Sequence, residues 1–242
     1  DIVLMKLVGI NPVIVHGGGP EITAYMNRLG LEVEFYNGLR VTTDEAMEVV
    51  KMVLVGKVNP ELVAAINQHG RLAVGVSGDD GNLVTATQRD ERLGRVGDVT
   101  KIDTTVIDNL IEDGFIPVVA TVAAGDDGGS FNVNADLVAA ELAAALGAEK
   151  VIFLTDVDGL YADFADKSSL ISVLTPAEAE EMIVNDQLEG GMVPKVAACV
   201  RALRGGVGRA HILNGTVPHA LLLEVYTDEG VGTMITETSE EN

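Results

Sequence analysis

Three consecutive glycines stand between an apolar stretch and a helix-forming stretch near the start of the sequence. They follow His16 and the β-branched run 12–15, and residues 21–29 then read as an amphipathic helix. Glycines at a helix start leave backbone N–H groups uncovered at the positive end of the helix dipole, which suits an oxyanion. A plain tight turn is the alternative interpretation, and the rest of the chain has to decide between the two.

Two charged residues stand in the first turns of expected helices. Lys195 follows the turn Gly190-Gly191, at a helix start where the dipole disfavours a cation. Either solvent screens a surface lysine there, or the lysine meets a transferring phosphoryl group. Asp136 stands where acidic residues commonly cap helices, so it is either a cap or a catalytic group.

Two further polar residues suit the recognition of a carboxylate. Arg40 follows a turn signal, and it either pairs with a neighbouring carboxylate or clamps a substrate carboxylate with its planar fork. Asn132 reads either as a turn residue or as part of the same site. The four histidines show no spacing typical of a metal site, and Cys199 fits a small buried apolar residue.

The composition restricts the classes of partner. The 242 residues carry a formal charge of −21, which argues against nucleic acid and against an anionic membrane surface. No apolar run approaches the roughly 20 residues of a spanning helix. A single cysteine excludes an internal disulfide and favours a reducing compartment, so a cytoplasmic location is expected.

Strands alternating with helices predict an α/β fold, an open and mostly parallel sheet sandwiched by helices. Hydrophobic residues make up 47% of the chain and aromatic residues only 4%, as is usual for such sheets. The expected strands lie at 12–15, 72–76, 116–120, 150–155 and 210–213. The loops that follow these strands should share one rim, where ligands bind. These loops are 16–19, 77–81, 120–132 and 155–160.

Other elements are predicted from local signals. Alternating residues predict a solvent-facing strand at 32–35, a β-hairpin over 82–102 and a closing edge strand at 233–235. A long helix from Thr43 should break near Gly56 and restart at 59–61.

Five motifs in order resemble those of the N-acetylglutamate kinase family. They are His16-Gly17-Gly18-Gly19-Pro20, Gly38-Leu39-Arg40-Val41-Thr42, Asn132-Val133-Asn134-Ala135-Asp136, Leu154-Thr155-Asp156-Val157-Asp158-Gly159 and Gly190-Gly191-Met192-Val193-Pro194-Lys195. Carbamate, uridylate and aspartate kinases share single motifs, but this set in this order is specific, and it covers essentially the whole chain. The resemblance implies an amino-acid-kinase, carbamate-kinase-like fold in two lobes, 1–148 for acetylglutamate and 149–242 for nucleotide and regulation.

The resemblance also implies the reaction and its residues. ATP, with Mg²⁺ carried by the nucleotide, would phosphorylate the γ-carboxylate of N-acetyl-L-glutamate in arginine biosynthesis. Substrate would be bound by Gly18, Gly19, Arg40 and Asn132. Lys195 would stabilise the transition state and Asp136 would orient the lysines. The nucleotide would be bound by Thr155, Asp156, Val157, Asp158, Gly159 and Leu160.

Regulation follows from the C-terminal segment 224–235, which resembles the arginine-binding segment of arginine-inhibited family members. The expected effector residues are His211, Glu224, Gly230 and Gly232, and an ordinary edge strand with a glycine turn is the alternative. By analogy the protein is a homodimer, or a hexamer when full length, and a PII-type regulator is a candidate partner.

The sequence departs from the family at its start. Members begin with a strand and a Lys-x-Gly-Gly turn that supplies a second phosphate-binding lysine, and this chain starts after that position. We therefore expect a fragment of a longer enzyme. The alternatives are a related kinase acting on another small acid, and a catalytically incomplete module that senses arginine or nucleotide.

Overall fold

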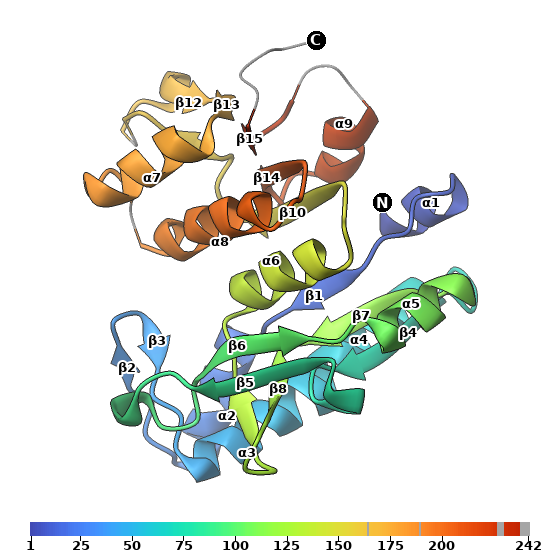
Figure 1. Cartoon of the computed structure of the whole chain (residues 1–242), viewed down its shortest axis with the longest axis vertical. Coiled ribbons are helices and arrows are strands. Elements are labelled where there is room, and N and C mark those ends of the chain that lie inside the picture. The colour runs from blue at the N-terminus through green and yellow to red at the C-terminus, as the bar shows by residue number, and fades with distance from the viewer. Residues whose placement is uncertain (164, 189, 227–229, 238–242) are drawn as a thin grey trace. The chain divides into compact units, whose positions relative to one another are not determined.

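The computed structural model describes residues 1–163, 165–188, 190–226 and 230–237 (Figure 1). The chain divides into two compact units, an N-terminal unit (Ile2–Val138) and a C-terminal unit (Ala139–Asn242, with Asp1). The division falls before the expected lobe boundary at 148, and that boundary stays a prediction. The α/β class, with parallel strands covered by helices, is confirmed in both units.

A three-stranded parallel sheet forms the centre of the N-terminal unit. Its strands are β1 (Ile14–His16), β7 (Ile116–Ala120) and β4 (Ala73–Ser77), in that order. The last residues of β1 and β4, His16 and Ser77, both pair with Ala120, so the three strands end in line. The segments after them, at the starts of 16–19, 77–81 and 120–132, therefore leave from one edge of this sheet, as expected. The fourth expected loop, 155–160, follows a strand of the C-terminal unit, so its place on the same rim stays a prediction.

A second, four-stranded sheet of the N-terminal unit is built mainly from hairpins. Its order is β6 (Gly97–Ile102), β5 (Val84–Gln88), β8 (Val122–Gly125) and β9 (Ser130–Asn132). The antiparallel pairing of β5 with β6 confirms the predicted hairpin. The prediction of a loop over 120–132 was wrong, because β8 and β9 form an antiparallel hairpin and β8 also pairs with β5. The pairing of β8 with β5 joins residues about 40 positions apart, so it leaves no local signal.

The expected strand at 32–35 was also wrong, since only Phe35 belongs to a strand. A short hairpin joins β2 (Phe35–Tyr36) to β3 (Leu39–Arg40). Asn37 and Gly38 both have positive φ, 49° and 77°, which is the geometry of a tight two-residue hairpin turn. One further hydrogen bond, from Val41 N to Glu34 O at 3.0 Å, continues the hairpin past Phe35, and it pairs with no other strand.

The long helix does not break at Gly56. The chain runs from α3 (Asp44–Val53) through the π-helical turn η1 (Leu54–Val58) directly into α4 (Asn59–Asn67). Pro60 stands in the first turn of α4, where its missing N–H costs little because the first helical N–H groups lack partners inside the helix. Gly56, where the sequence predicted a break, therefore lies in a π-helical turn of a continuous helix.

The remaining helices of the N-terminal unit cover its sheets. They are α1 (Ile2–Leu7), α2 (Gly19–Leu29), α5 (Thr105–Glu112) and the first residues of α6 (Ala135–Ala145). Two short 3₁₀ turns lie at Asp80–Asn82 and Glu91–Leu93. Ile22 and Met26 of α2 pack with α3 and with Ala120 and Val122, and this cluster fixes α2 beside the sheet edge.

The C-terminal unit has a four-stranded mixed sheet. Its order is β10 (Lys150–Thr155), β14 (Arg209–Asn214), β15 (Thr233–Thr236) and β13 (Val173–Leu174). The prediction that 233–235 is an edge strand was wrong, because β15 lies between β14 and β13. Thr233 and Ile235 are accordingly fully buried and Thr236 nearly so, while Met234 is partly buried.

Helices and a small hairpin complete the C-terminal unit. The helices are α7 (Pro176–Val184), α8 (Met192–Arg204) and α9 (Ala220–Tyr226), with a 3₁₀ turn at Lys167–Ser169. The hairpin pairs β11 (Leu160–Tyr161) with β12 (Leu170–Ile171). In Figure 1 α7 and α8 run along this sheet, and their apolar faces share one core with Val151, Phe153 and Ile212. Cys199 is fully buried in that core, in agreement with its expected apolar role.

Candidate active site

The glycine turn is closely packed at Gly17 and Gly18, whereas a side chain at Gly19 would meet open space. A Cβ atom on Gly18 would lie 2.8 Å from Leu54 Cδ2 and 3.2 Å from Val58 Cγ2. One on Gly17 would lie 3.3 Å from Ala135 Cβ at the start of α6. The turn is thus a bare backbone segment between β1 and α2, and no side chain caps the N-terminus of α2.

Arg40 lies against this turn as a buried cation. Its Nη2 donates to Gly19 O at 3.0 Å and to Thr23 Oγ1 at 2.7 Å, and the residue is only 7% exposed. The guanidinium also lies 4.8 Å from the ring of Phe35. Burial lowers the pKa of Arg40, but an arginine guanidinium titrates so far above neutral pH that the group stays charged. Within the described residues no carboxylate pairs with it.

Asn132 joins the same group of residues through Thr42. Its Nδ2 donates to Thr42 Oγ1 at 3.2 Å, and that hydroxyl donates to Arg40 O at 3.0 Å. The structure therefore brings together Gly18, Gly19, Arg40 and Asn132, the four residues expected to bind substrate. Thr42 was not predicted as a site residue. Residues i and i+2 of an extended segment lie on the same face, so its spacing from Arg40 could have indicated it.

Asp136 stands in the first turn of α6, close in sequence to the residue that packs on Gly17. The helix N-cap is Asn134, whose Oδ1 accepts the N–H of Leu137 at 3.0 Å. Because Asn134 caps the helix, Asp136 is not needed as a cap. A role in the chemistry remains a prediction for this residue.

Lys195 lies in the first turn of α8, as expected. That turn contains no acidic residue, and Pro194 precedes the lysine. Helix packing against β14 in the core of the C-terminal unit fixes the backbone at this point.

The segment 155–160, expected to bind nucleotide, is tied to two strands of the C-terminal unit. Asp158 accepts hydrogen bonds from Asn214 Nδ2 at 2.7 Å and Tyr161 OH at 2.9 Å, which lower the pKa of its carboxyl. Leu160 N donates to Thr233 Oγ1 at 2.8 Å, and a Cβ on Gly159 would lie 2.5 Å from that oxygen. Asn214 and Thr233 were missed because they lie more than fifty residues away in the sequence.

The four expected effector residues also come together. His211 Nδ1 lies 2.6 Å from Glu224 Oε1, and both side chains are buried. Glu224 Oε2 accepts the N–H of Val231 at 3.0 Å, and a Cβ on Gly230 would lie 3.7 Å from that oxygen. Gly232 packs on Ile212 O. Burial raises the pKa of Glu224, but the hydrogen bonds from His211 and Val231 outweigh this and lower it.

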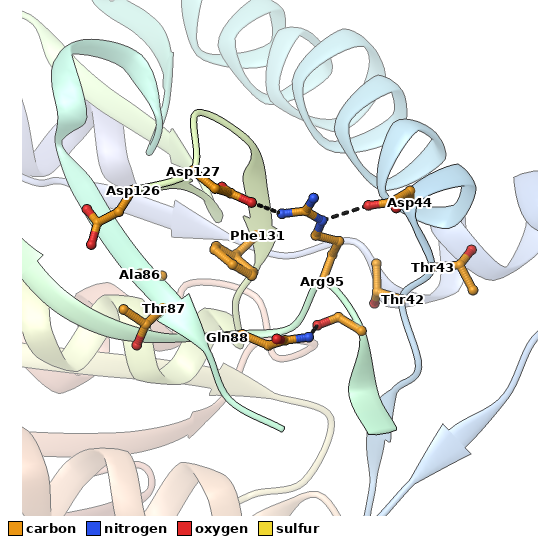
Figure 2. A pocket seen from close by; sticks show the side chains of 11 residues that line it. Thr42, Thr43, Asp44, Ala86, Thr87, Gln88, Arg95, Asp126, Asp127 and Phe131 are labelled. Atoms are coloured by element: carbon orange, nitrogen blue, oxygen red, sulfur yellow. Dashed lines mark hydrogen bonds and ion pairs between the residues drawn. The ribbon is translucent and has the colours of Figure 1, made fainter. Parts of the chain in front are cut away.

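A cavity of about 610 Å³ lies elsewhere in the N-terminal unit (Figure 2). At its centre Arg95 donates from Nε to Asp44 at 2.7 Å and from Nη1 to Asp127 at 2.5 Å, which raise the pKa of the guanidinium. The remaining lining is Thr42, Thr43, Ala86, Thr87, Gln88, Gly94, Asp126 and Phe131. With three aspartates to one arginine, this cavity repels anions, in contrast to the surroundings of Arg40.

The described residues contain neither a metal-binding cluster nor a membrane-spanning helix. They contain no cluster of three or more His, Cys, Asp or Glu side chains placed to hold a metal ion. None of the described helices combines the length and apolarity needed to cross a bilayer.

A model of the amino acid kinase family matches residues 1–214. The chain belongs to the amino acid kinase family. In the sequence, the family resemblance linked two motifs to phosphoryl transfer. In the fold, these motifs lie at the glycine turn and at the start of α8.

One protein sequence and two solved structures are similar to this chain over nearly its whole length. The acetylglutamate kinase of Nostoc punctiforme is 55% identical over 236 residues, covering 97% of this chain and 79% of the relative. The structure of smu.665 from Streptococcus mutans UA159 has a TM-score of 0.85 and 31% identity, covering 98% of this chain and 90% of that one. N-acetylglutamate synthase from Neisseria gonorrhoeae, complexed with coenzyme A and N-acetyl-glutamate, has a TM-score of 0.85 and 27% identity over 99% of this chain and 55% of its own.

Proposed function

We propose that this chain transfers the γ-phosphoryl group of ATP to the γ-carboxylate of N-acetyl-L-glutamate. The products are N-acetyl-L-glutamyl 5-phosphate and ADP, a step of arginine biosynthesis. The observation that carries the proposal is the buried guanidinium of Arg40, which touches the glycine turn and has no carboxylate partner among the described residues. A buried cation without a counter-ion favours an anionic ligand. The acetylglutamate kinases that the chain resembles supply the identity of that anion.

The reaction needs positioning and positive potential more than it needs a base. A carboxylate oxygen is already ionised at neutral pH, attacks the γ-phosphorus and displaces ADP, so no proton has to be removed. The obstacle is the repulsion between two anions, which backbone N–H groups, cations and the Mg²⁺ that enters with ATP offset. Such a reaction is consistent with an Arg40 guanidinium that pairs with no carboxylate of the described residues.

Each residue then has a role by its position in the family motifs. Gly18 and Gly19 donate backbone N–H groups to substrate and to the transferring group, Arg40 holds the α-carboxylate, and Asn132 binds beside it. Lys195 neutralises charge in the transition state and Asp136 orients the cations. The segment from Thr155 to Leu160 binds the nucleotide. We assign acetylglutamate to residues 1–148 and nucleotide to 149–242.

A coupled assay tests this function directly. Full-length protein with Mg-ATP should release ADP only when N-acetyl-L-glutamate is present, and hydroxylamine should trap the acyl phosphate. A panel with N-acetyl-L-aspartate and N-acetyl-L-aminoadipate distinguishes a kinase for another small acid, because Arg40 and Asn132 read carboxylates and not chain length. ADP release that no N-acylated acid stimulates would overturn the proposal and favour a sensing module.

Feedback inhibition by arginine is part of the proposal, and the buried pair of His211 and Glu224 supports it. In calorimetry, arginine should bind full-length protein at millimolar or lower concentration. Glu224→Gln removes the buried carboxylate available to a guanidinium and should weaken that binding by about tenfold or more. The control is Glu180→Gln on α7, an exposed glutamate paired with Arg204, which should bind arginine like the wild type. Equal binding by both variants would remove Glu224 from the effector site.

We further infer a homo-oligomer, a dimer or a hexamer when full length, and a PII-type protein as a regulator. Light scattering of the full-length protein measures the oligomeric state. Co-elution with a PII-type protein in gel filtration tests the proposed regulator. A cytoplasmic location is consistent with the single buried cysteine.

A further inference from the structure

Asn59 is a buried polar residue that the reaction described above leaves without a role. It is 6% exposed at the first position of α4, and its Nδ2 lies 2.8 Å from Val118 O and 3.1 Å from His16 Nε2. A carbonyl can only accept, so the nitrogen of the amide faces Val118, and its two hydrogens serve both contacts. His16 Nε2 must then accept a hydrogen bond.

This contact sets the tautomer of His16. When Nε2 accepts from Asn59, the ring proton sits on Nδ1, which lies 2.9 Å from Gly17 O and donates to it. Burial lowers the pKa of His16, which favours the neutral ring that this arrangement requires. A chain of hydrogen bonds thus runs from Asn59 through His16 to the carbonyl of Gly17.

The Gly17 carbonyl in turn controls the direction of the Gly18 N–H. The two groups belong to one planar trans peptide, so they point in opposite directions. Holding the carbonyl on the His16 ring therefore directs the Gly18 N–H away from that ring. Without that restraint, adjacent glycines would sample many peptide orientations.

The surrounding structure is built to allow this contact. Asn59 N–H donates to Leu54 O across the π-helical turn, which brings residues five apart onto one face of the helix. Leu54 and Val58 consequently pack on Gly18 while Asn59 reaches His16. On β4, a Cβ atom at Gly75 would lie 1.9 Å from Asn59 Oδ1, so only glycine leaves room for the amide.

We propose that Asn59 is a positioning residue for phosphoryl transfer, which acts through the His16 tautomer on the Gly18 N–H. This inference rests on the proposed use of the glycine turn as the anion-binding element. It also gives the π-helical turn a purpose, since a regular α-helix would place residues 54 and 59 on different faces. Asn59 touches no reacting atom in this role.

The test compares Asn59→Ala with Asn67→Ala, a matched control at the other end of the same helix. Asn67 also ties α4 to the sheet, through Leu72 N, Ala73 N and Ala73 O, at the end of β4 away from the turn. Both variants should lower the melting temperature. Only Asn59→Ala should lower kcat/KM for N-acetyl-L-glutamate, by about 10- to 100-fold, with the KM for ATP within about twofold. Equal kinetic losses in the two variants would overturn the proposal.

Variants of His16 keep the test decisive if Asn59→Ala does not fold. His16→Asn retains an amide donor near the Nδ1 position, so it should keep most of the activity. In His16→Leu, kcat/KM for N-acetyl-L-glutamate should fall by about 10- to 100-fold. When Asn59→Ala is added to His16→Asn, kcat/KM for N-acetyl-L-glutamate should fall by less than about twofold further, because Asn59 acts only through the His16 ring. A full additive loss would show a merely structural role. Wild-type turnover of N-acetyl-L-glutamate decides the proposed function separately from all of these results.

Discussion

Lys195→Ala is expected to lower kcat for acetylglutamate phosphorylation by about 10²–10³-fold while changing the affinity for ATP much less. The lysine is proposed to neutralise charge that develops on the transferring phosphoryl group, and removal of one such contact costs mainly transition-state stabilisation. Its position supports this role, because a cation in the first turn of α8 opposes the helix dipole and gains nothing from it. The measurement is steady-state kinetics together with nucleotide binding by calorimetry.

The matched control for Lys195 is Lys150→Ala in the same unit. Lys150 is the first residue of β10, at the opposite end of that strand from Thr155. This control removes the same charge, so it should leave kcat within about twofold of the wild type. Near-normal turnover in Lys195→Ala, or equal losses in both variants, would contradict the role given to Lys195.

The second large effect is expected at Arg40. Arg40→Lys keeps the charge but loses the planar fork that can bind a carboxylate through two parallel hydrogen bonds. We expect kcat/KM for N-acetyl-L-glutamate to fall by about 10²-fold in Arg40→Lys and by about 10³-fold in Arg40→Ala, mostly through KM. The KM for ATP should change little.

Stability has to be measured beside these kinetics, because Arg40 also donates to Gly19 O and Thr23 Oγ1. The control is Arg28→Lys in the last turn of α2, where the exposed guanidinium lies 4.9 Å from the ring of Tyr25. A normal KM for acetylglutamate in a folded Arg40→Lys protein would remove Arg40 from the substrate site. It would also remove the main support for the proposed function.

The elements that carry the site were largely predictable from the sequence. The apolar run before His16, the glycines and the amphipathic pattern of α2 act over a few residues, so local rules place them correctly. The strands whose ends align at Ala120 were likewise recognised by their buried β-branched runs. Errors concentrated where long-range pairing overrides local pattern, as in the pairing of β8 with β5 and in β15 between two other strands.

The side-chain contacts of the site were not predictable in the same way. Arg40 could have been an ordinary surface ion pair. In the fold, the contact of the β2–β3 hairpin with α2 buries it, and no carboxylate among the described residues pairs with it. In the sequence, Asn59 indicated only the start of a helix. Its contact with His16, 43 residues earlier in the chain, could not be predicted because no local pattern encodes it.

By itself the sequence determined the glycine turn, the alternation of strands and helices and the small set of cations in a strongly acidic chain. The tertiary structure alone decided that Arg40 is buried without a carboxylate partner in the described part of the chain, and that the Asn59 amide reaches His16 beside the turn. The physical reason is range. Propensity and periodicity act between neighbours along the chain, whereas burial and hydrogen bonding are decided by segments that only folding brings together.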